Sequence, residues 1–136
     1  MRISAKAEYA CLAIIELAES ASDGSPKRIR DIAEAQRIPE PYLIKILLQL
    51  KASGLVQSAR GSVGGYQLAR SASEISVADV IASIEGRTEP VCKGDSSAAH
   101  NLVDVLVRAH AAQWDILDSC TIAHLARRVA YHDWVL

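Results

Sequence analysis

The fold is decided by residues 40–68, which read EPYLIKILLQLKASGLVQSARGSVGGYQL. The first half repeats apolar residues at intervals of three and four, at Leu43, Ile46, Leu47 and Leu50. That period predicts a helix from about 40 to 52, with a proline tolerated in its first turn and a glycine after its end. The second half predicts a small β-hairpin, because short extended segments at 55–58 and 66–69 flank a glycine-rich tip at 60–65.

Helical periodicity also governs the residues on both sides of this stretch. Upstream it predicts helices over 5–20 and 29–36, so three helices precede the hairpin. Downstream it predicts a helix over 77–85, a long helix over 97–119 and a last helix that begins after Thr121. The predicted fold class is therefore mainly α: a winged helix-turn-helix domain with a small β-hairpin wing plus a long C-terminal dimerisation helix.

The long predicted helix carries two apolar stripes, and each stripe needs something to pack against. One stripe can pack on its own domain, and the same helix of a second chain can cover the other. The expected homodimer interface comprises Leu102, Leu106, Ala109, Gln113 and Ile116. We therefore divide the chain into a domain at 1–86, a sensor-type loop at 87–96, and a dimerisation helix with a C-terminal helix and tail at 97–136.

Composition excludes several classes of protein. Half of the 136 residues are hydrophobic, which suffices for a packed core and excludes a disordered chain. No apolar run reaches the roughly 18 residues that a membrane helix needs. The three cysteines form no disulfide pattern, so a cytoplasmic protein is expected. No enzyme is predicted, because no phosphate-binding glycine loop, HExxH or clustered catalytic residues can be read.

Positive charge gathers in the front half of the chain, which predicts an anionic partner. Residues 1–70 hold ten Lys/Arg and seven Asp/Glu, whereas residues 71–136 hold five and nine. Residues 37–60 have a local net charge of +3, which favours DNA over an ordinary polar surface. Residues 1–86 are therefore interpreted as a winged helix-turn-helix DNA-binding domain.

The outward face of the third helix and the tip of the wing are the main candidate DNA contacts. A recognition helix presents its first outward residues to base edges, while a glycine-rich tip brings backbone N–H groups and an arginine to phosphates or a groove. The candidates are Arg2, Ser4, Lys6, Pro41, Tyr42, Ile44, Lys45, Arg60, Gly61, Ser62 and Gly64. Exposed Ile44 and Leu48 leave open an alternative, a winged-helix dimer that acts as a protein-interaction adaptor without specific DNA binding.

Several short motifs are spread along nearly the whole chain. They are MRISAKAEYA at 1–10, Ile32-Ala33, Pro41-Tyr42-Leu43, Leu50 to Val56, RGSVGGY at 60–66, Asp79-Val80-Ile81, Glu85-Gly86 and Thr121-Ile122. Together they resemble the Rrf-two family of winged helix-turn-helix transcriptional regulators. The resemblance implies a homodimeric bacterial regulator that binds pseudo-palindromic operators in double-stranded DNA. Several members of that family respond to iron–sulfur status, nitric oxide, redox state or cysteine supply.

The cysteines differ from those of the cluster-binding members of this family. Those members carry three cysteines in the loop before the dimer helix. Cys92 matches the first, and the other two places fall near Ala98 and Asp104. No cofactor is therefore assigned, and an iron–sulfur cluster held by Cys92 with Glu8 of the second chain stays as an alternative.

The DNA-contacting positions differ as well. Cluster-binding members use a Ser and a Glu early in the recognition helix and an Arg in the wing. This chain has Pro41, Ile44 and Arg60 at the matching places. Proline and isoleucine side chains make no base-edge hydrogen bond, although Ile44 can contact a thymine methyl. A different operator sequence is therefore expected.

Cys92 has three interpretations at this point. It is a packed inert residue, a redox or ligand sensor whose thiolate the neighbouring Lys93 favours, or a cluster ligand. The loop that holds Cys92 joins the DNA-binding domain to the long helix, so a modification there would change the spacing of the two recognition helices. His100 shows no metal-site spacing, and Cys11 and Cys120 are expected to be structural.

Overall fold

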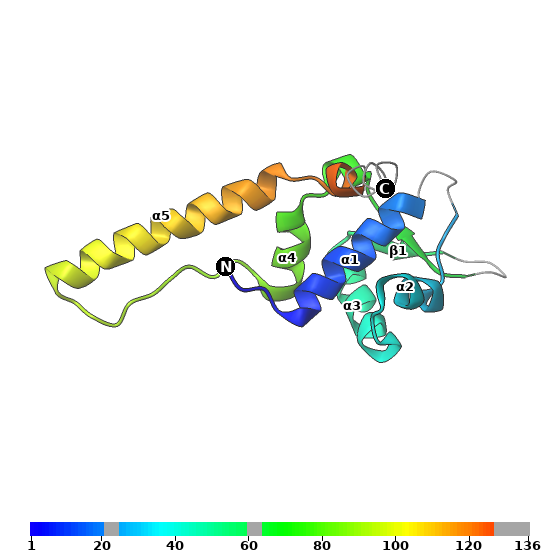
Figure 1. Cartoon of the computed structure of the whole chain (residues 1–136), viewed down its shortest axis with the longest axis horizontal. Helices are drawn as coiled ribbons and strands as arrows, with labels where there is room; N and C mark the ends of the chain where they lie inside the picture. Colours follow the sequence, from blue (N-terminus) through cyan, green and yellow to red (C-terminus); the bar gives the residue numbers. More distant parts are fainter. Residues whose placement is uncertain (21–24, 60–63, 127–136) are drawn as a thin grey trace, which may run out of the picture.

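The computed structural model describes residues 1–20, 25–59 and 64–126 (Figure 1). Its elements are α1 (Ala5–Ser20), α2 (Ile29–Gln36), α3 (Glu40–Ala52), β1 (Val56–Ser58), β2 (Tyr66–Leu68), the 3-10 helix η2 (Ala72–Glu74), α4 (Val77–Glu85) and α5 (Ser97–Ser119). Residues 122–126 are helical as well. The predicted winged helix-turn-helix with a long C-terminal helix is confirmed. The wing-tip residues Arg60, Gly61 and Ser62 lie outside the described residues.

The core lies where α1 packs against α2, α3 and α4. Helix α1 buries three alanines, Ala7, Ala10 and Ala13, whose small side chains let the neighbouring helices approach closely. The apolar face predicted for the third helix is fully buried, since Leu43, Ile46, Leu47 and Leu50 each have 0% exposure. The three-and-four spacing of α3 therefore reports a real buried stripe.

The turn between α2 and α3 depends on an unusual backbone conformation at Arg37. This residue has φ 56° and ψ 46°, the left-handed region that non-glycine residues rarely adopt. Ile38 then donates its N–H to the carbonyl of Ala33 at 3.0 Å and buries its side chain. The tight turn places α3 across α2 and directs the first turn of α3 outward.

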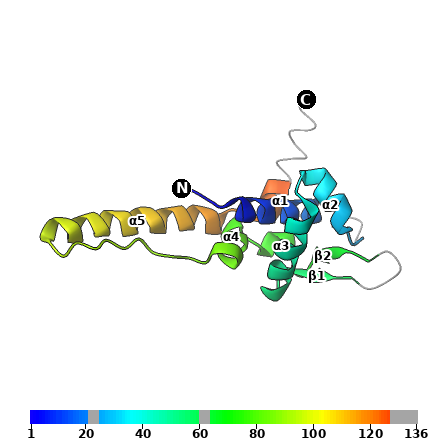
Figure 2. The same ribbon diagram turned by 90° about the horizontal axis from the view of Figure 1, so that it is seen from below.

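The wing is a two-stranded antiparallel hairpin that leaves the helical body beside α3 (Figure 2). Its register pairs Val56 with Leu68, and Ser58 with Tyr66. The segment before α2 adds a short third edge, because Lys27 and Tyr66 exchange two backbone hydrogen bonds of 2.8 Å each. The base of the wing is thereby attached to the helix-turn-helix.

Helix α5 extends away from the body as an arm (Figure 1). A capping box between Ser76 and Asp79 begins α4, and Ser96 caps α5. Backbone hydrogen bonds join Val77 to Cys120 and Ile122 to Ile75, at 2.9 and 2.8 Å. These bonds attach the C-terminal end of the arm to the start of α4.

Side chains of α5 also hold the arm to the body, with Trp114 at their centre. Trp114 is the buried residue of α5, and it packs in a second small core with Ala78 and Ile81 of α4. The Arg87 guanidinium lies 4.4 Å from the centre of the Trp114 ring and forms a two-pronged ion pair with Asp118, at 2.7 and 3.1 Å. This ion pair holds the pKa of the Asp118 carboxyl below its usual range.

The two apolar stripes of α5 have different surroundings. The stripe that contains Trp114 is half-buried or buried along its length, at Val103, Val107, His110 and Leu117. The other stripe is uncovered, with Leu102 53%, Leu106 37% and Ile116 69% exposed. No helix among the described residues is long and apolar enough to cross a membrane.

Candidate nucleic-acid interface

The outer face of α3 presents a mixed apolar and basic surface. Tyr42 is 60% and Ile44 42% exposed, Leu48 is 55% exposed, and Pro41 and Lys45 are exposed as well. Pro41, Lys45 and Leu48 lie opposite the buried stripe of the same helix, and Tyr42 and Ile44 lie on its flanks. The geometry fits a helix whose outer face is free to enter a groove. Pro41 lies in the first turn, where its missing N–H leaves no unpaired donor.

The N-terminal candidates lie at the start of α1. Arg2, Ser4 and Lys6 are all exposed. Ser4 caps the helix, because its Oγ accepts the N–H of Ala7 at 3.1 Å. The backbone N–H of Ser4 donates to Glu85 at 2.6 Å, and hydrogen bonds from Ser4 hold the pKa of Glu85 below its usual range. Ser4 therefore fixes the N-terminus to α4, in addition to any contact that its exposed hydroxyl makes.

On the tip side of the wing strands, the backbone can approach a partner closely. Gly64 has φ 62°, a left-handed conformation that a glycine adopts at little cost. Lys51, at the end of α3, donates to Ser58 Oγ of β1 at 3.0 Å and so connects the recognition helix to the wing. The wing residues Arg60, Gly61 and Ser62 stay candidates outside the described part of the chain.

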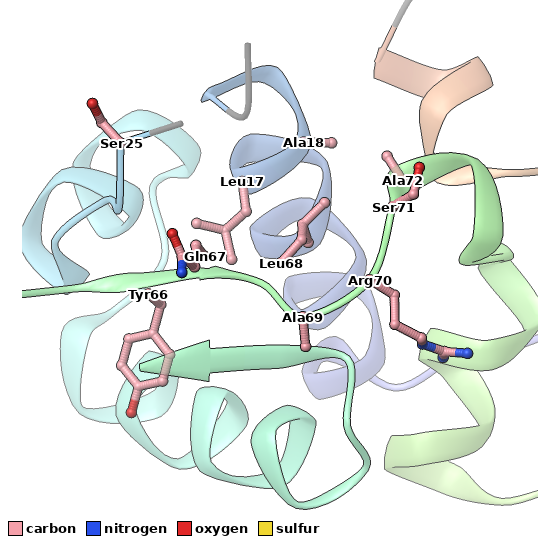
Figure 3. A pocket seen from close by; sticks show the side chains of 10 residues that line it. All are labelled: Leu17, Ala18, Ser25, Tyr66, Gln67, Leu68, Ala69, Arg70, Ser71 and Ala72. Atoms are coloured by element: carbon pink, nitrogen blue, oxygen red, sulfur yellow. The ribbon is translucent and has the colours of Figure 1, made fainter. Parts of the chain in front are cut away.

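A surface cavity of about 670 Å³ lies behind the wing, between the end of α1, β2 and η2 (Figure 3). Leu17 and Leu68 lie close together in this view, and the guanidinium of Arg70 points away from them. Among the described residues that line the cavity, Arg70 is the one that carries a charge.

The candidate sensor residues do not form a metal site within one chain. Cys92 is half-buried in the 87–96 loop, and Glu8 and His100 are exposed. In the part of the chain that the structure describes, no three His, Cys, Asp or Glu side chains are grouped so that they could hold a metal ion. One loop thiol per chain does not fit a three-thiolate iron–sulfur cluster.

The other two cysteines have structural surroundings. Cys11 packs against both the main core and the Trp114 core. Burial, with smaller contributions from Glu85 and Glu8, raises the pKa of its thiol to about 11. Cys11 therefore stays a protonated, unreactive thiol at neutral pH. Cys120 is half-buried at the end of α5, where its backbone carbonyl bonds to Val77.

Some residues that shape this interface were not found by sequence reasoning. The left-handed Arg37 gives no sequence signal, because arginine rarely adopts that conformation. Lys27 reads as a surface lysine before a helix, yet its backbone forms the third edge of the wing. The pairing of Arg87 with Trp114 and Asp118 joins residues 27 and 31 positions apart, which no local pattern reports.

The fold and its exposed, partly basic recognition surface define a winged helix-turn-helix regulator of transcription. A family model described as Rrf2, iron-dependent transcriptional regulator, matches residues 3–128. The chain belongs to the Rrf2 (Rrf-two) family. The resemblance seen in its motifs is thus confirmed, and the protein is a DNA-binding transcriptional regulator.

Three similar proteins illustrate this membership. A relative from Mycobacterium tuberculosis, named as an HTH-type transcriptional regulator, is 42% identical over 132 residues that cover 93% of this chain and 81% of the relative. The structure of CymR, the global cysteine regulator of Bacillus subtilis, gives a TM-score of 0.82 at 33% identity, with 94% of this chain and 98% of that chain covered. T. potens IscR gives 0.79 at 33% identity, with 95% and 88% covered.

Proposed function

We propose that the chain works as a cytoplasmic homodimer that reads a pseudo-palindromic operator with α3 and the wing, by binding alone and without catalysis. In this proposal residues 1–86 bind DNA, residues 87–96 form a sensor loop and residues 97–136 dimerise. The observation that carries the proposal is the contrast on α3, whose inner face is fully buried while Tyr42, Ile44 and Lys45 are exposed. A helix that used this outer face only for packing would not leave it open.

The uncovered stripe of α5 supports the dimer. Leu102, Leu106 and Ile116 form an exposed apolar row, flanked by Ala109 and Gln113, on a helix of 23 residues. The same row on a second chain is self-complementary about a two-fold axis, as a homodimer requires. Two recognition helices would then face two half-sites, which must lie roughly 34 Å apart to share one face of the DNA.

One arginine variant and one lysine variant test the DNA contacts. An operator is first selected from a pool of random duplexes, and affinity is then measured over a range of salt concentrations. Arg60→Ala should weaken operator binding by roughly 1–3 kcal/mol, if the arginine reads a base or a narrow minor groove. Lys45→Ala should weaken all sequences about equally and flatten the salt dependence, because a phosphate contact releases counterions. Unchanged operator binding in both variants would mean that neither residue makes the DNA contact proposed for it.

Sensing is proposed to act through Cys92. The 87–96 loop begins at Arg87, which pairs with Asp118 of α5, and it ends at Ser96, which caps α5. A change in the loop would therefore reach both the DNA-binding domain and the long helix. Peroxide would oxidise the Cys92 thiol to a sulfenic acid while being reduced to water, which adds a polar group at this joint. CymR of Staphylococcus aureus, which is 34% identical to this chain, has a structure in an oxidised form, and this supports a redox-linked signal.

Cys92→Ser should fold, dimerise and bind DNA in the reduced state, but lose any oxidant-dependent change in DNA affinity. Cys11→Ser and Cys120→Ser are the matched controls and should keep that change, since Cys11 is held protonated by burial. The measurement is operator affinity before and after peroxide treatment. The sensor proposal fails if the wild-type affinity is the same in the reduced and oxidised states. If Glu8 is a cluster ligand, Glu8→Ala should lose the colour of the anaerobically purified protein.

A further inference from the structure

Helix α1 places a charged side chain inside the protein. Among the residues that the structure describes, Glu16 is the one charged residue that is buried, with 7% exposure. Both of its carboxylate oxygens are used. Oε1 accepts a hydrogen bond from Gln36 Nε2 at 2.7 Å, and Oε2 forms an ion pair with Lys27 Nζ.

Glu16 is buried and Lys27 is half-buried, and an ion pair of this kind is weak evidence for stability. Removing charges from water opposes folding, and apolar side chains of similar volume often serve folding equally well. The Glu16 carboxylate provides directional contacts, because each of its two oxygens holds one donor, from Gln36 or from Lys27, in a defined position. The arrangement therefore points to a geometric role for Glu16.

The Lys27 branch leads to the wing. While its side chain pairs with Glu16, its backbone N–H and C=O both bond to Tyr66, the first residue of β2. The neighbouring Gly65 has φ 119°, and a Cβ there would lie 2.6 Å from the Lys27 carbonyl oxygen. Only a glycine lets the two backbones approach this closely, so the contact between Lys27 and the wing is built into the chain.

The Gln36 branch leads to the recognition helix. Gln36 is the last residue of α2, and the next residue is the left-handed Arg37 that turns the chain toward α3. A side chain held at Gln36 thus holds the start of this turn. Glu16 is therefore connected on one side to the base of the wing and on the other to the turn before α3.

We propose that Glu16 is a positioning residue for DNA recognition, which fixes the wing relative to the recognition helix through Lys27 and Gln36. The inference rests on the proposed use of α3 and the wing to contact DNA. Glu16 itself touches neither surface. Its loss should leave the contacts present but let the wing change its position relative to α3.

The variant that separates position from stability replaces the pair by apolar side chains, Glu16→Met with Lys27→Met. Glu74→Gln, an exposed carboxylate in η2, is the control. Amide hydrogen exchange at Tyr66, whose N–H bonds to Lys27, should accelerate roughly tenfold in the double variant as local opening becomes easier. Exchange in the buried part of α3 should stay the same. Unchanged exchange at Tyr66 would show that Glu16 does not hold the wing, and the proposal would fail. If this variant does not fold, Glu16→Gln is used, since it keeps the size of the side chain.

A second measurement tests the effect on DNA. The pair variant should lose roughly tenfold in operator affinity on its own, and little more when combined with Arg60→Ala, because both then remove the same wing contact. Equal losses in both backgrounds would mean that Glu16 does not act through the wing, which overturns the proposal. If exchange at Tyr66 is faster but Arg60→Ala does not change operator affinity, the wing does not contact DNA as the proposed function requires. Glu16 would then have only a structural role.

Discussion

Leu106→Glu should convert the protein to a monomer and remove most of its operator affinity. Leu106 lies in the middle of the uncovered stripe of α5, between Leu102 and Ile116. In a two-fold interface each substitution occurs twice, so two carboxylates would be buried in one apolar seam without partners. A monomer reaches one half-site only and loses the linked second binding event, which lowers affinity by about 10²-fold or more.

Light scattering at micromolar concentration and a gel shift on the selected operator measure the two effects. Asn101→Glu is the matched control, because it adds the same charge at an exposed position of α5 outside the stripe. It should leave both the dimer and the binding unchanged. A stable wild-type monomer, or a Leu106→Glu dimer with full affinity, would contradict the proposed interface.

Trp114→Ala should produce the largest loss of stability and release the arm from the body. Trp114 is 8% exposed, packs on Ala78 and Ile81, and donates Nε1–H to His110 Nε2 at 3.0 Å. Truncating a buried tryptophan typically costs 3–5 kcal/mol, so we expect a loss of about that size in the free energy of unfolding. The Arg87 guanidinium also loses the aromatic face on which it lies.

Denaturant titration measures the free energy of unfolding. Affinity for versions of the selected operator with altered half-site spacing shows whether α5 still holds the two recognition helices at a fixed distance. Wild type should bind one spacing best, whereas Trp114→Ala should bind several spacings with similar, weaker affinity. Trp114→Phe keeps most of the apolar contact and loses the hydrogen bond, so a smaller cost of about 1 kcal/mol is expected. A Trp114→Ala cost no larger than that of Trp114→Phe would mean that the ring does not anchor α5.

The two uses of α5 explain why its sequence has two apolar stripes. One stripe is covered by the chain itself around Trp114, and the other is left exposed. Periodicity alone finds both stripes but cannot tell which of them packs internally. That distinction requires the loop at 87–96 and α4 to be placed in space.

The candidate DNA contacts were predictable to a different degree. The exposed positions of α3 follow from the same period that predicts its buried leucines, because a side chain opposite a buried stripe must face outward. The wing could be located from its glycines, but its attachment to Lys27 could not, because Lys27 and its partner Tyr66 lie 39 positions apart in the sequence. Nothing near Lys27 in the sequence indicates a β-bridge.

The sequence by itself determined the order and bounds of helices α1 to α5, the buried face of α3, the capping box of α4 and the family. These features depend on interactions between residues a few positions apart, which leave a period or a motif in the chain. Only the tertiary structure decided that Glu16 is buried between Lys27 and Gln36, that Arg37 takes a left-handed turn, and that Trp114 anchors the arm. Those features depend on contacts between segments far apart in the chain, and a glutamate, an arginine or a tryptophan is equally compatible with other surroundings until the fold brings its partners to it.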